Sequence, residues 1–440
     1  MVHSRAASPQ PGVPPSIAAL SGGFPLSAPQ STAASAADAP VERGGFWDSL
    51  RRYPTFRTLW FAALSASIGQ WMQQVALGWI ALTMTNSPGF VGIVSFVAGL
   101  PFLIVAPLGG ALIDRVDRRR LMLACQALAA GLALIVAIDV IAGTAQPWHL
   151  VVAAFANGSL QALLNPTQQS LVPALVPRHS MTNAIGLMSA GQNMTRMVGP
   201  GLAGVVIGAV GEGETFLLQA LALAGAFVLV LGMRLPERPP STGVSRNPFE
   251  GLRLIATRSD LRAICLLAFF PTLLIFPYIG FLNVFARDIL DIGPQGLGLL
   301  MATSSVGAIA GSLLVAGKGR AEGMGKFLLG GIIVYGFAIM VMALSRTLWL
   351  TLPMLVIGGF LGAAFMVGNN ALIQHRIEDA VRGRVMGAYM LTWGLMPLGA
   401  LPMGMLGSRI GMPEAVLAFT IVSTLCTIVL GLTNRTLREL

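Results

Sequence analysis

A single arginine interrupts one of the longest apolar stretches of this sequence. Arg196 lies about 13 residues into the apolar range 183–210, so a helix would carry it about 20 Å from its first residue. An arginine at that depth costs several kcal/mol unless it faces a cavity and has a partner. No carboxylate occurs at comparable depth in the first half of the chain. Arg196 is therefore predicted either to bind an anionic group of a substrate or to hold helices together through amides, water or backbone carbonyls.

Carboxamide side chains recur at helical spacing in two other apolar ranges. Asn157, Gln161 and Asn165 follow at intervals of four residues and share one helix face, and Gln70 and Gln74 do the same earlier in the chain. Such amides seek partners in an apolar environment, so they either bind helices to one another or line a wet path. Both interpretations stay open. The second half offers weaker polar candidates for the same path, which are Tyr278, Asn283, Asn369, Asn370 and Thr392.

The sequence lacks the residue patterns that catalysis requires. His-Glu-x-x-His and Gly-x-Ser-x-Gly do not occur, no paired Asp lies within an apolar range, and the four His are at tails or range ends. An enzyme needs an acid, a base or a nucleophile in a constellation. The chain has three cysteines, Cys125, Cys265 and Cys426. None of them has another Cys or a His at the spacing of a metal site. We therefore predict that the protein is not an enzyme and binds neither a metal nor a cofactor.

The composition indicates that lipid is the main solvent of this chain. Of its 440 residues, 55% are hydrophobic and 10% are charged, whereas soluble domains carry about 25% charged residues. Apolar ranges of about 20 residues, long enough to cross a bilayer, recur after residue 55. Residues 1–46 are rich in Ala, Ser, Pro and Gly without a continuous apolar core. They are predicted to form a disordered cytoplasmic tail and not a signal peptide.

The formal net charge of +10 raises the possibility of nucleic-acid binding, but the basic residues alternate along the chain as in a membrane protein. Arg287, Arg346 and Arg409 fall on one side of the predicted membrane and Arg196 inside it, which leaves 24 of the 28 basic residues on the other side. Basic residues collect on the cytoplasmic side. The sequence therefore predicts a lipid bilayer as partner, no nucleic acid, and both termini in the cytoplasm.

Twelve apolar ranges are predicted to cross the membrane as helices. They are 57–82, 91–113, 121–141, 149–168, 183–210, 215–233, 261–285, 294–316, 326–344, 349–370, 384–407 and 414–432. They form two sets of six, in domains 47–233 and 261–440. The linker 234–260 between them places Phe249, Leu252 and Ile255 on one face, as in an amphipathic helix that lies on a membrane surface.

The two sets of helices repeat one another. Residues 56–60, Phe-Arg-Thr-Leu-Trp, correspond to Leu-Arg-Ala-Ile-Cys at 261–265, and Asn165 corresponds to Asn370. The offset is 205 residues in both matches. Internal repeats of six helices predict a substrate path between the two halves, near the middle of the membrane.

The loop after the second predicted span carries the most distinctive motif of the chain. Its sequence, Gly110-Ala-Leu-Ile-Asp114-Arg115-Val-Asp117-Arg118-Arg119-Arg120, resembles the loop motif of the major facilitator superfamily, in which Asp117 would be glycine. The resemblance implies that Asp114 meets the N-terminal end of the eleventh helix, near Arg384, where the helix dipole favours negative charge. The implied gating motif consists of Gly110, Asp114, Arg115, Arg118, Arg119 and Arg384. A plain cytoplasmic basic loop is the alternative.

Further segments narrow the resemblance to the secretion-effector branch of that superfamily, which contains the enterobactin exporter. They are residues 70–79, 165–169, 193–200 and 382–386 within a similarity that covers about residues 47 to 435. Relatives commonly carry Arg where Gln168 stands, so a role of that arginine does not transfer. Gly199, Pro200 and Gly204 resemble the antiporter motif of the fifth helix, and close helix packing is the alternative.

These observations predict an all-helical membrane protein with twelve transmembrane helices in two pseudo-symmetric six-helix bundles, the major facilitator fold. The resemblance implies proton-linked export of a small amphiphilic or anionic molecule, of siderophore, drug or metabolite type, by a monomer in the bacterial inner membrane. Import of a nutrient and a membrane-embedded enzyme are the alternatives. Buried carboxylates are scarce, since Asp139 and Asp288 are predicted near outer helix ends. Proton coupling therefore rests on the resemblance alone.

Overall fold

The computed structural model of the protein describes residues 47–233, 248–318, 323–434 and 437. The predicted tail and the first part of the predicted linker lie outside these residues. Every regular element of the described part is a helix. The prediction of an all-helical protein is confirmed for these residues.

Six long helices form the first half of the described chain. After the short α1 (Asp48–Arg52) come α2 (Pro54–Thr85), α3 (Pro88–Arg115), α4 (Arg118–Ile141), α5 (Pro147–Leu175), the 3-10 turn η1 (Arg178–Ser180), α6 (Met181–Val210) and α7 (Glu212–Leu231). Proline is the first residue of α2, α3 and α5, where a missing backbone N–H costs no hydrogen bond. Each of the first six predicted spans overlaps one of these helices.

The second half contains more and shorter elements. They are α8 (Pro248–Thr257), α9 (Ser259–Leu274), η2 (Phe276–Phe281), α10 (Leu282–Val284), the π-helical turn η3 (Phe285–Ile289), α11 (Gly293–Lys318), α12 (Met324–Leu344), α13 (Leu348–His375), α14 (Asp379–Met390), η4 (Leu391–Gly394), α15 (Leu395–Ile410) and α16 (Met412–Thr433). The predicted spans 261–285 and 384–407 are thus each built from several helices. Pro277 and Pro397 explain the breaks, because a proline has no N–H to give to the carbonyl four residues earlier.

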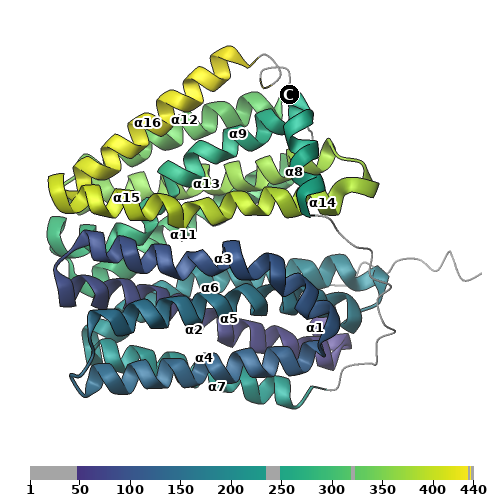
Figure 1. The fold of residues 1–440 in the computed structure, drawn as a ribbon, viewed down its shortest axis with the longest axis vertical. Coiled ribbons are helices and arrows are strands. Elements are labelled where there is room, and N and C mark those ends of the chain that lie inside the picture. The colour runs from purple at the N-terminus through teal and green to yellow at the C-terminus, as the bar shows by residue number, and fades with distance from the viewer. Residues whose placement is uncertain (1–46, 234–247, 319–322, 435–436, 438–440) are drawn as a thin grey trace, which may run out of the picture. The chain divides into compact units, whose positions relative to one another are not determined.

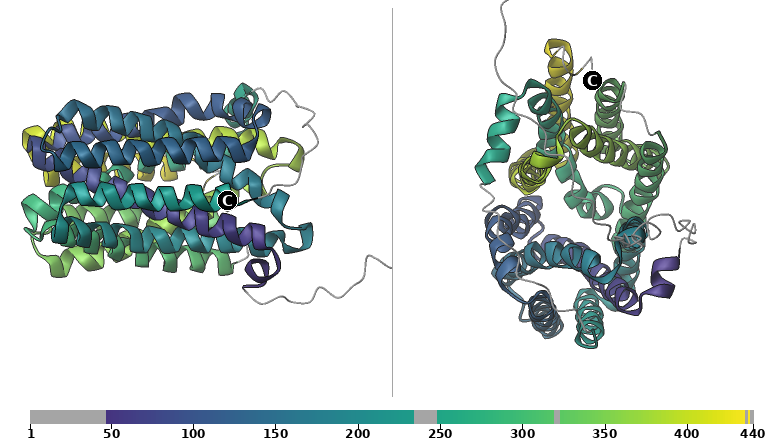
Figure 2. Two further views of the ribbon diagram at one scale, coloured as in Figure 1. Left: turned by 90° about the horizontal axis from the view of Figure 1, so that it is seen from below. Right: turned by 90° about the vertical axis from the view of Figure 1, so that its right-hand side faces the viewer.

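Helices of the same half account for most of the packing (Figure 1). In the first half, α2 packs against α6 and α7, α3 against α5, and α4 against α7; in the second, α13 packs against α11 and α12, and α12 against α16. The right-hand view of Figure 2 looks along these helices and shows the purple and blue ones gathered apart from the yellow-green ones. Two pairs of helices, α3 with α15 and α6 with α11, make the main contacts between the halves.

The helices present an apolar surface suited to lipid. Seven segments of the described residues are long and apolar enough to cross a membrane, and large apolar side chains such as Leu128, Ile135 and Leu313 are more than 60% exposed. Such a surface is stable in hydrocarbon and costly in water. The chain is therefore a multi-pass membrane protein, while the number of twelve crossings stays a prediction.

The linker helix α8 packs against α14 and α9, and Gly251 lies at the contact with α14. A Cβ atom at Gly251 would lie 2.0 Å from the carbonyl oxygen of Arg384, and Ile255 is 9% exposed whereas Leu252 is 52% exposed. Helix α8 therefore has a protein neighbour, and the prediction that its apolar face lies on a membrane surface stays a prediction. The side chain of Phe249 lies outside the described residues.

Candidate functional site

A cavity of about 330 Å³ lies between α2, α5 and α6. Its lining consists of Ala63, Ala66, Ser67, Gln70, Trp71, Gln161, Leu164, Asn165, Gln168, Gln169, Gln192, Asn193 and Arg196. The spacing of three and four residues along each helix turns these side chains to one side. Four of the predicted site residues, Gln70, Gln161, Asn165 and Arg196, are thereby brought together.

The guanidinium group of Arg196 rests on an aromatic ring. Its Cζ atom lies 5.7 Å from the ring centroid of Trp71, which is within the range of a cation–π interaction. Gly199 makes this contact possible, since a Cβ atom at this position would come within 2.6 Å of Trp71 Cβ. The helix-5 motif therefore helps to position the arginine.

Arg196 also lies close to the second half of the chain. Tyr278 of η2, a predicted site residue, is 1% exposed and lies outside the cavity lining. The Oγ atom of Ser305 donates a hydrogen bond to the carbonyl oxygen of Arg196 at 3.3 Å. Among the described residues, Arg196 forms no ion pair with a carboxylate. Its positive charge thus stands at the boundary between the halves without an anionic partner from these residues.

The other predicted site residues lie outside the cavity lining. Gln74 is exposed and Asn157 is buried. Asn369 donates a hydrogen bond to the hydroxyl of Tyr389 at 3.0 Å. Asn370 accepts one from Gln374 on the same helix, and Thr392 is half-buried in η4.

Several lining residues were not found from the sequence. Gln192 and Asn193 precede Arg196 by four and three residues, and Gln169 follows Asn165 by four. Extending the helical spacing one more turn would have found these three. Trp71 gave no comparable signal, since aromatic residues are common in apolar helices.

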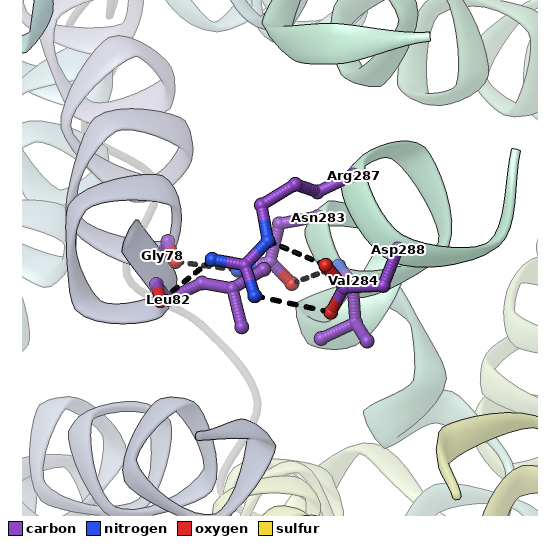
Figure 3. Close-up of polar contacts among 6 residues, drawn as sticks. All are labelled: Gly78, Leu82, Asn283, Val284, Arg287 and Asp288. Carbon is purple, nitrogen blue, oxygen red and sulfur yellow. Dashed lines mark hydrogen bonds and ion pairs between the residues drawn. The ribbon is translucent and has the colours of Figure 1, made fainter. Parts of the chain in front are cut away.

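A group of hydrogen bonds joins α2 to the segment α10–η3 at the predicted outer end (Figure 3). Asn283 Nδ2 donates to the carbonyl oxygen of Gly78, and Arg287 Nη1 donates to that of Leu82 at 2.8 Å. Asp288 accepts from Arg287 Nε and fixes the direction of the guanidinium group. This group of contacts, which we call the outer clasp, connects the two halves.

The two pairs of the outer clasp have the sequence separation of the internal repeat. Gly78 and Asn283 are 205 residues apart, as are Leu82 and Arg287, which is the offset between residues 56–60 and 261–265. Equivalent positions of two repeats can be neighbours only close to the axis that relates them. This contact is therefore what a pseudo-twofold axis between α2 and α10 would produce.

Small residues allow the other contacts between the halves at this end. The Oγ of Ser408 on α15 accepts a hydrogen bond from the N–H of Gly89 on α3 at 2.7 Å. A Cβ atom at Gly92 would lie 2.9 Å from the carbonyl oxygen of Ala400, and one at Gly204 would lie 2.4 Å from that of Pro294. Glycine at these positions lets the backbones approach closely.

The substitution Gly204→Ala is expected to lower the stability of the protein. The added methyl group must push α6 away from α11, and overpacking of this kind costs about 1–3 kcal/mol. The midpoint of thermal unfolding in detergent measures this loss. Gly201→Ala is the matched control, because a Cβ atom at Gly201 meets nothing within 4 Å. Unchanged stability with lost transport in Gly204→Ala would instead favour a role beyond helix packing.

The predicted gating loop is described in part. Asp117 is the N-cap of α4 and accepts a hydrogen bond from the Arg120 N–H at 2.8 Å, which gives a structural reason for an aspartate where the superfamily has glycine. Arg118 donates to the carbonyl oxygen of Ser170 at 2.9 Å. Arg119 donates to those of Val230 and Leu231 at the end of α7.

These arginines hold the predicted inner ends of α4, α5 and α7 together within the first half. The surroundings of Gly110 and the side chains of Asp114 and Arg115 lie outside the described part of the structure. The contact of Asp114 with the eleventh helix therefore stays a prediction. That helix begins at Asp379, and Arg384 lies in its second turn.

Asp139 connects the end of α4 to the start of α5. Its carboxylate lies 2.6 Å from Nδ1 of His149 and accepts a hydrogen bond from Thr144 Oγ1 at 2.7 Å. The location near a helix end agrees with the prediction, but the group is not simply solvated, because it is 21% exposed. In the part of the chain that the structure describes, no group of three or more His, Cys, Asp or Glu is placed to hold a metal ion.

Comparison with known proteins gives consistent matches along nearly the whole chain. The family model described as transmembrane secretion effector matches residues 45–439. The staphyloferrin A transporter of Staphylococcus aureus is 27% identical over 84% of this chain and 94% of its own length. The multidrug efflux pump Tap of Mycolicibacterium fortuitum is 28% identical over 86% of this chain and 95% of its own.

A solved structure shows the same fold. A bacterial homologue of the human lysosomal transporter Spinster, in an inward-facing and unoccupied conformation, aligns with a TM-score of 0.71. The alignment covers 87% of this chain and 98% of that chain at 15% sequence identity. At this identity the likeness concerns the fold alone.

Proposed function

Because this chain belongs to the transmembrane secretion effector family of the major facilitator superfamily, we propose that it exports a small molecule with an anionic group from the cell in exchange for protons. It does so as a monomer in the bacterial inner membrane, with both termini in the cytoplasm. Relatives named as efflux pumps support the direction of transport. The family and these relatives are transporters, so no catalytic step is part of the proposal.

Arg196 is the observation that carries this proposal. A guanidinium group in a cavity between apolar helices pays a desolvation cost that a bound anion repays. The described residues offer no carboxylate to it. The hydrogen bond from Ser305 of α11 to the carbonyl oxygen of Arg196 supports a binding position close to the second half as well as the first.

Transport then follows from alternating access. The outer clasp and the glycine contacts close the predicted outer end, and the cavity lies between these contacts and the predicted inner ends of α2, α5 and α6. An anion that binds to Arg196 from inside leaves when the halves rock and the outer contacts open. Proton exchange is supported by the resemblance of Gly199, Pro200 and Gly204 to the antiporter motif.

Export is tested by growth and by vesicle transport. A host strain without its own efflux pumps should tolerate a toxic substrate better when it produces this protein. Inverted vesicles with an imposed proton gradient should then accumulate that compound in radiolabelled form, because their cytoplasmic face is outside. Accumulation in right-side-out vesicles alone would support nutrient import instead.

A further inference from the structure

The lining of the cavity is dominated by carboxamide groups. Seven of its thirteen residues are Asn or Gln, which are Gln70, Gln161, Asn165, Gln168, Gln169, Gln192 and Asn193. Arg196 is the only charged residue among the thirteen, and neither Asp, Glu nor His is present. Each amide brings two N–H donors and one carbonyl acceptor. The wall of the cavity is therefore polar on three helices.

These amides are not used to join helices. Across residues 47–233, 248–318 and 323–434, no hydrogen bond connects any of the seven carboxamide groups to another protein group. Gln161 and Gln168 are only 5% and 6% exposed. Polar groups with so little exposure need partners, and leaving one unpaired costs about 1–3 kcal/mol. Of the two interpretations of the amide stripes, this favours the lining of a wet path.

The chemistry of the wall selects between ligand classes. A lipophilic ligand would displace water from several amides without replacing their hydrogen bonds, so each amide would oppose binding. A cation would meet Arg196 and no carboxylate. An anion with many oxygen atoms would satisfy the amide N–H groups and the guanidinium group together.

We propose that the cavity binds a hydrophilic organic anion that carries several hydroxyl or carboxyl groups, in contrast to lipophilic or cationic drugs. This inference rests on the proposed function and narrows its substrate. It distinguishes the expected substrate of this protein from that of the relative named as a multidrug efflux pump, although that relative matches most of the chain. The ring of Trp71 covers one side of the guanidinium group and leaves its planar edge free for bidentate binding of a carboxylate.

The binding test compares two monoanions, gluconate with its hydroxyl groups and octanoate without them. The purified full-length protein is heated in detergent with each anion or with ethidium, a lipophilic cation. Gluconate is expected to raise the unfolding midpoint, while octanoate and ethidium leave it nearly unchanged. Equal shifts with octanoate and gluconate would show that charge alone is recognised and would overturn the proposal.

Substitution of a single carboxamide residue tests whether gluconate binds in this cavity. Gln70→Leu is expected to weaken gluconate binding at least about fivefold, because one hydrogen-bonding partner is lost. Gln74→Leu is the matched control, since Gln74 lies one turn further on the same helix and outside the lining. Equal weakening by both substitutions would contradict the assignment of the cavity.

Transport assays separate failure of the substrate class from failure of export. Export of ethidium in inverted vesicles, without binding of gluconate, would overturn the substrate class and leave the proposed export intact. Binding of gluconate without accumulation in inverted vesicles would support the substrate class and contradict export.

Discussion

The variant Arg196→Gln is expected to lose transport almost completely while its abundance in the membrane stays normal. Glutamine keeps hydrogen-bonding capacity but removes the charge that faces the anionic group. Hydrogen bonds to charged groups contribute about 1.5–3 kcal/mol, so the transport rate at low substrate concentration should fall about ten- to hundredfold. Initial rates in proteoliposomes, normalised to the amount of inserted protein, measure this fall.

Two further variants distinguish charge from position. Arg196→Lys keeps the charge but loses the planar group that rests on Trp71, and we expect intermediate activity because a lysine cannot bind a carboxylate in bidentate fashion. Arg346→Gln is the control, since this arginine is exposed and pairs loosely with Glu414 at 3.9 Å. Wild-type transport by Arg196→Gln would remove Arg196 from the site and leave it as a structural residue.

Much of the fold follows from the one-dimensional pattern of the chain. The apolar ranges mark the long helices, because a helix in lipid must be about as long as the bilayer is thick. The breaks in the helices cannot be predicted from proline alone. Pro277 lies at a break in its predicted span, whereas Pro200 lies inside the continuous helix α6. Proline within a membrane helix is tolerated when neighbouring groups satisfy the freed carbonyl, and such neighbours are not visible in the sequence.

Helical spacing predicts part of the candidate site, while a contact across the fold leaves no trace in the sequence. Helical spacing pointed to Gln161 and Asn165, and apolar surroundings pointed to Arg196. Trp71 reaches Arg196 from a segment 125 residues away in the chain. No periodicity encodes such a contact, so only the packing of α2 against α6 reveals it.

The two halves contribute unequal parts to the site in spite of their repeat. The first half supplies the whole lining of the cavity, and the second half supplies the side chains of the outer clasp. In a symmetric arrangement, the side chain at position 78 would also donate a hydrogen bond to the main chain at position 283. Gly78 cannot do so, because glycine has no side chain. The clasp therefore consists of side chains of one half bound to main-chain carbonyls of the other.

This asymmetry makes the outer clasp sensitive to a single substitution. The variant Arg287→Ala is expected to shift the protein toward a conformation that is open at the outer end. One charge-assisted hydrogen bond of about 1.5–3 kcal/mol is lost, and every 1.4 kcal/mol changes a population ratio about tenfold. Spin labels at positions 148 and 349, which are exposed on different halves, should report a larger fraction of long distances.

The same variant should bind substrate more weakly from the inside. If a smaller fraction of the protein is in the inward-open state, the apparent dissociation constant rises in inverse proportion to that fraction, although the cavity itself is unchanged. Asn283→Ala should act in the same direction, whereas Arg346→Ala at the same predicted end should have no effect. If Arg287→Ala leaves both the distance distribution and the affinity unchanged, the contacts of Asn283 and of the glycines of α3 and α6 hold this end closed without Arg287. A loss of affinity without a change in distances would place Arg287 in the binding path and not in the clasp.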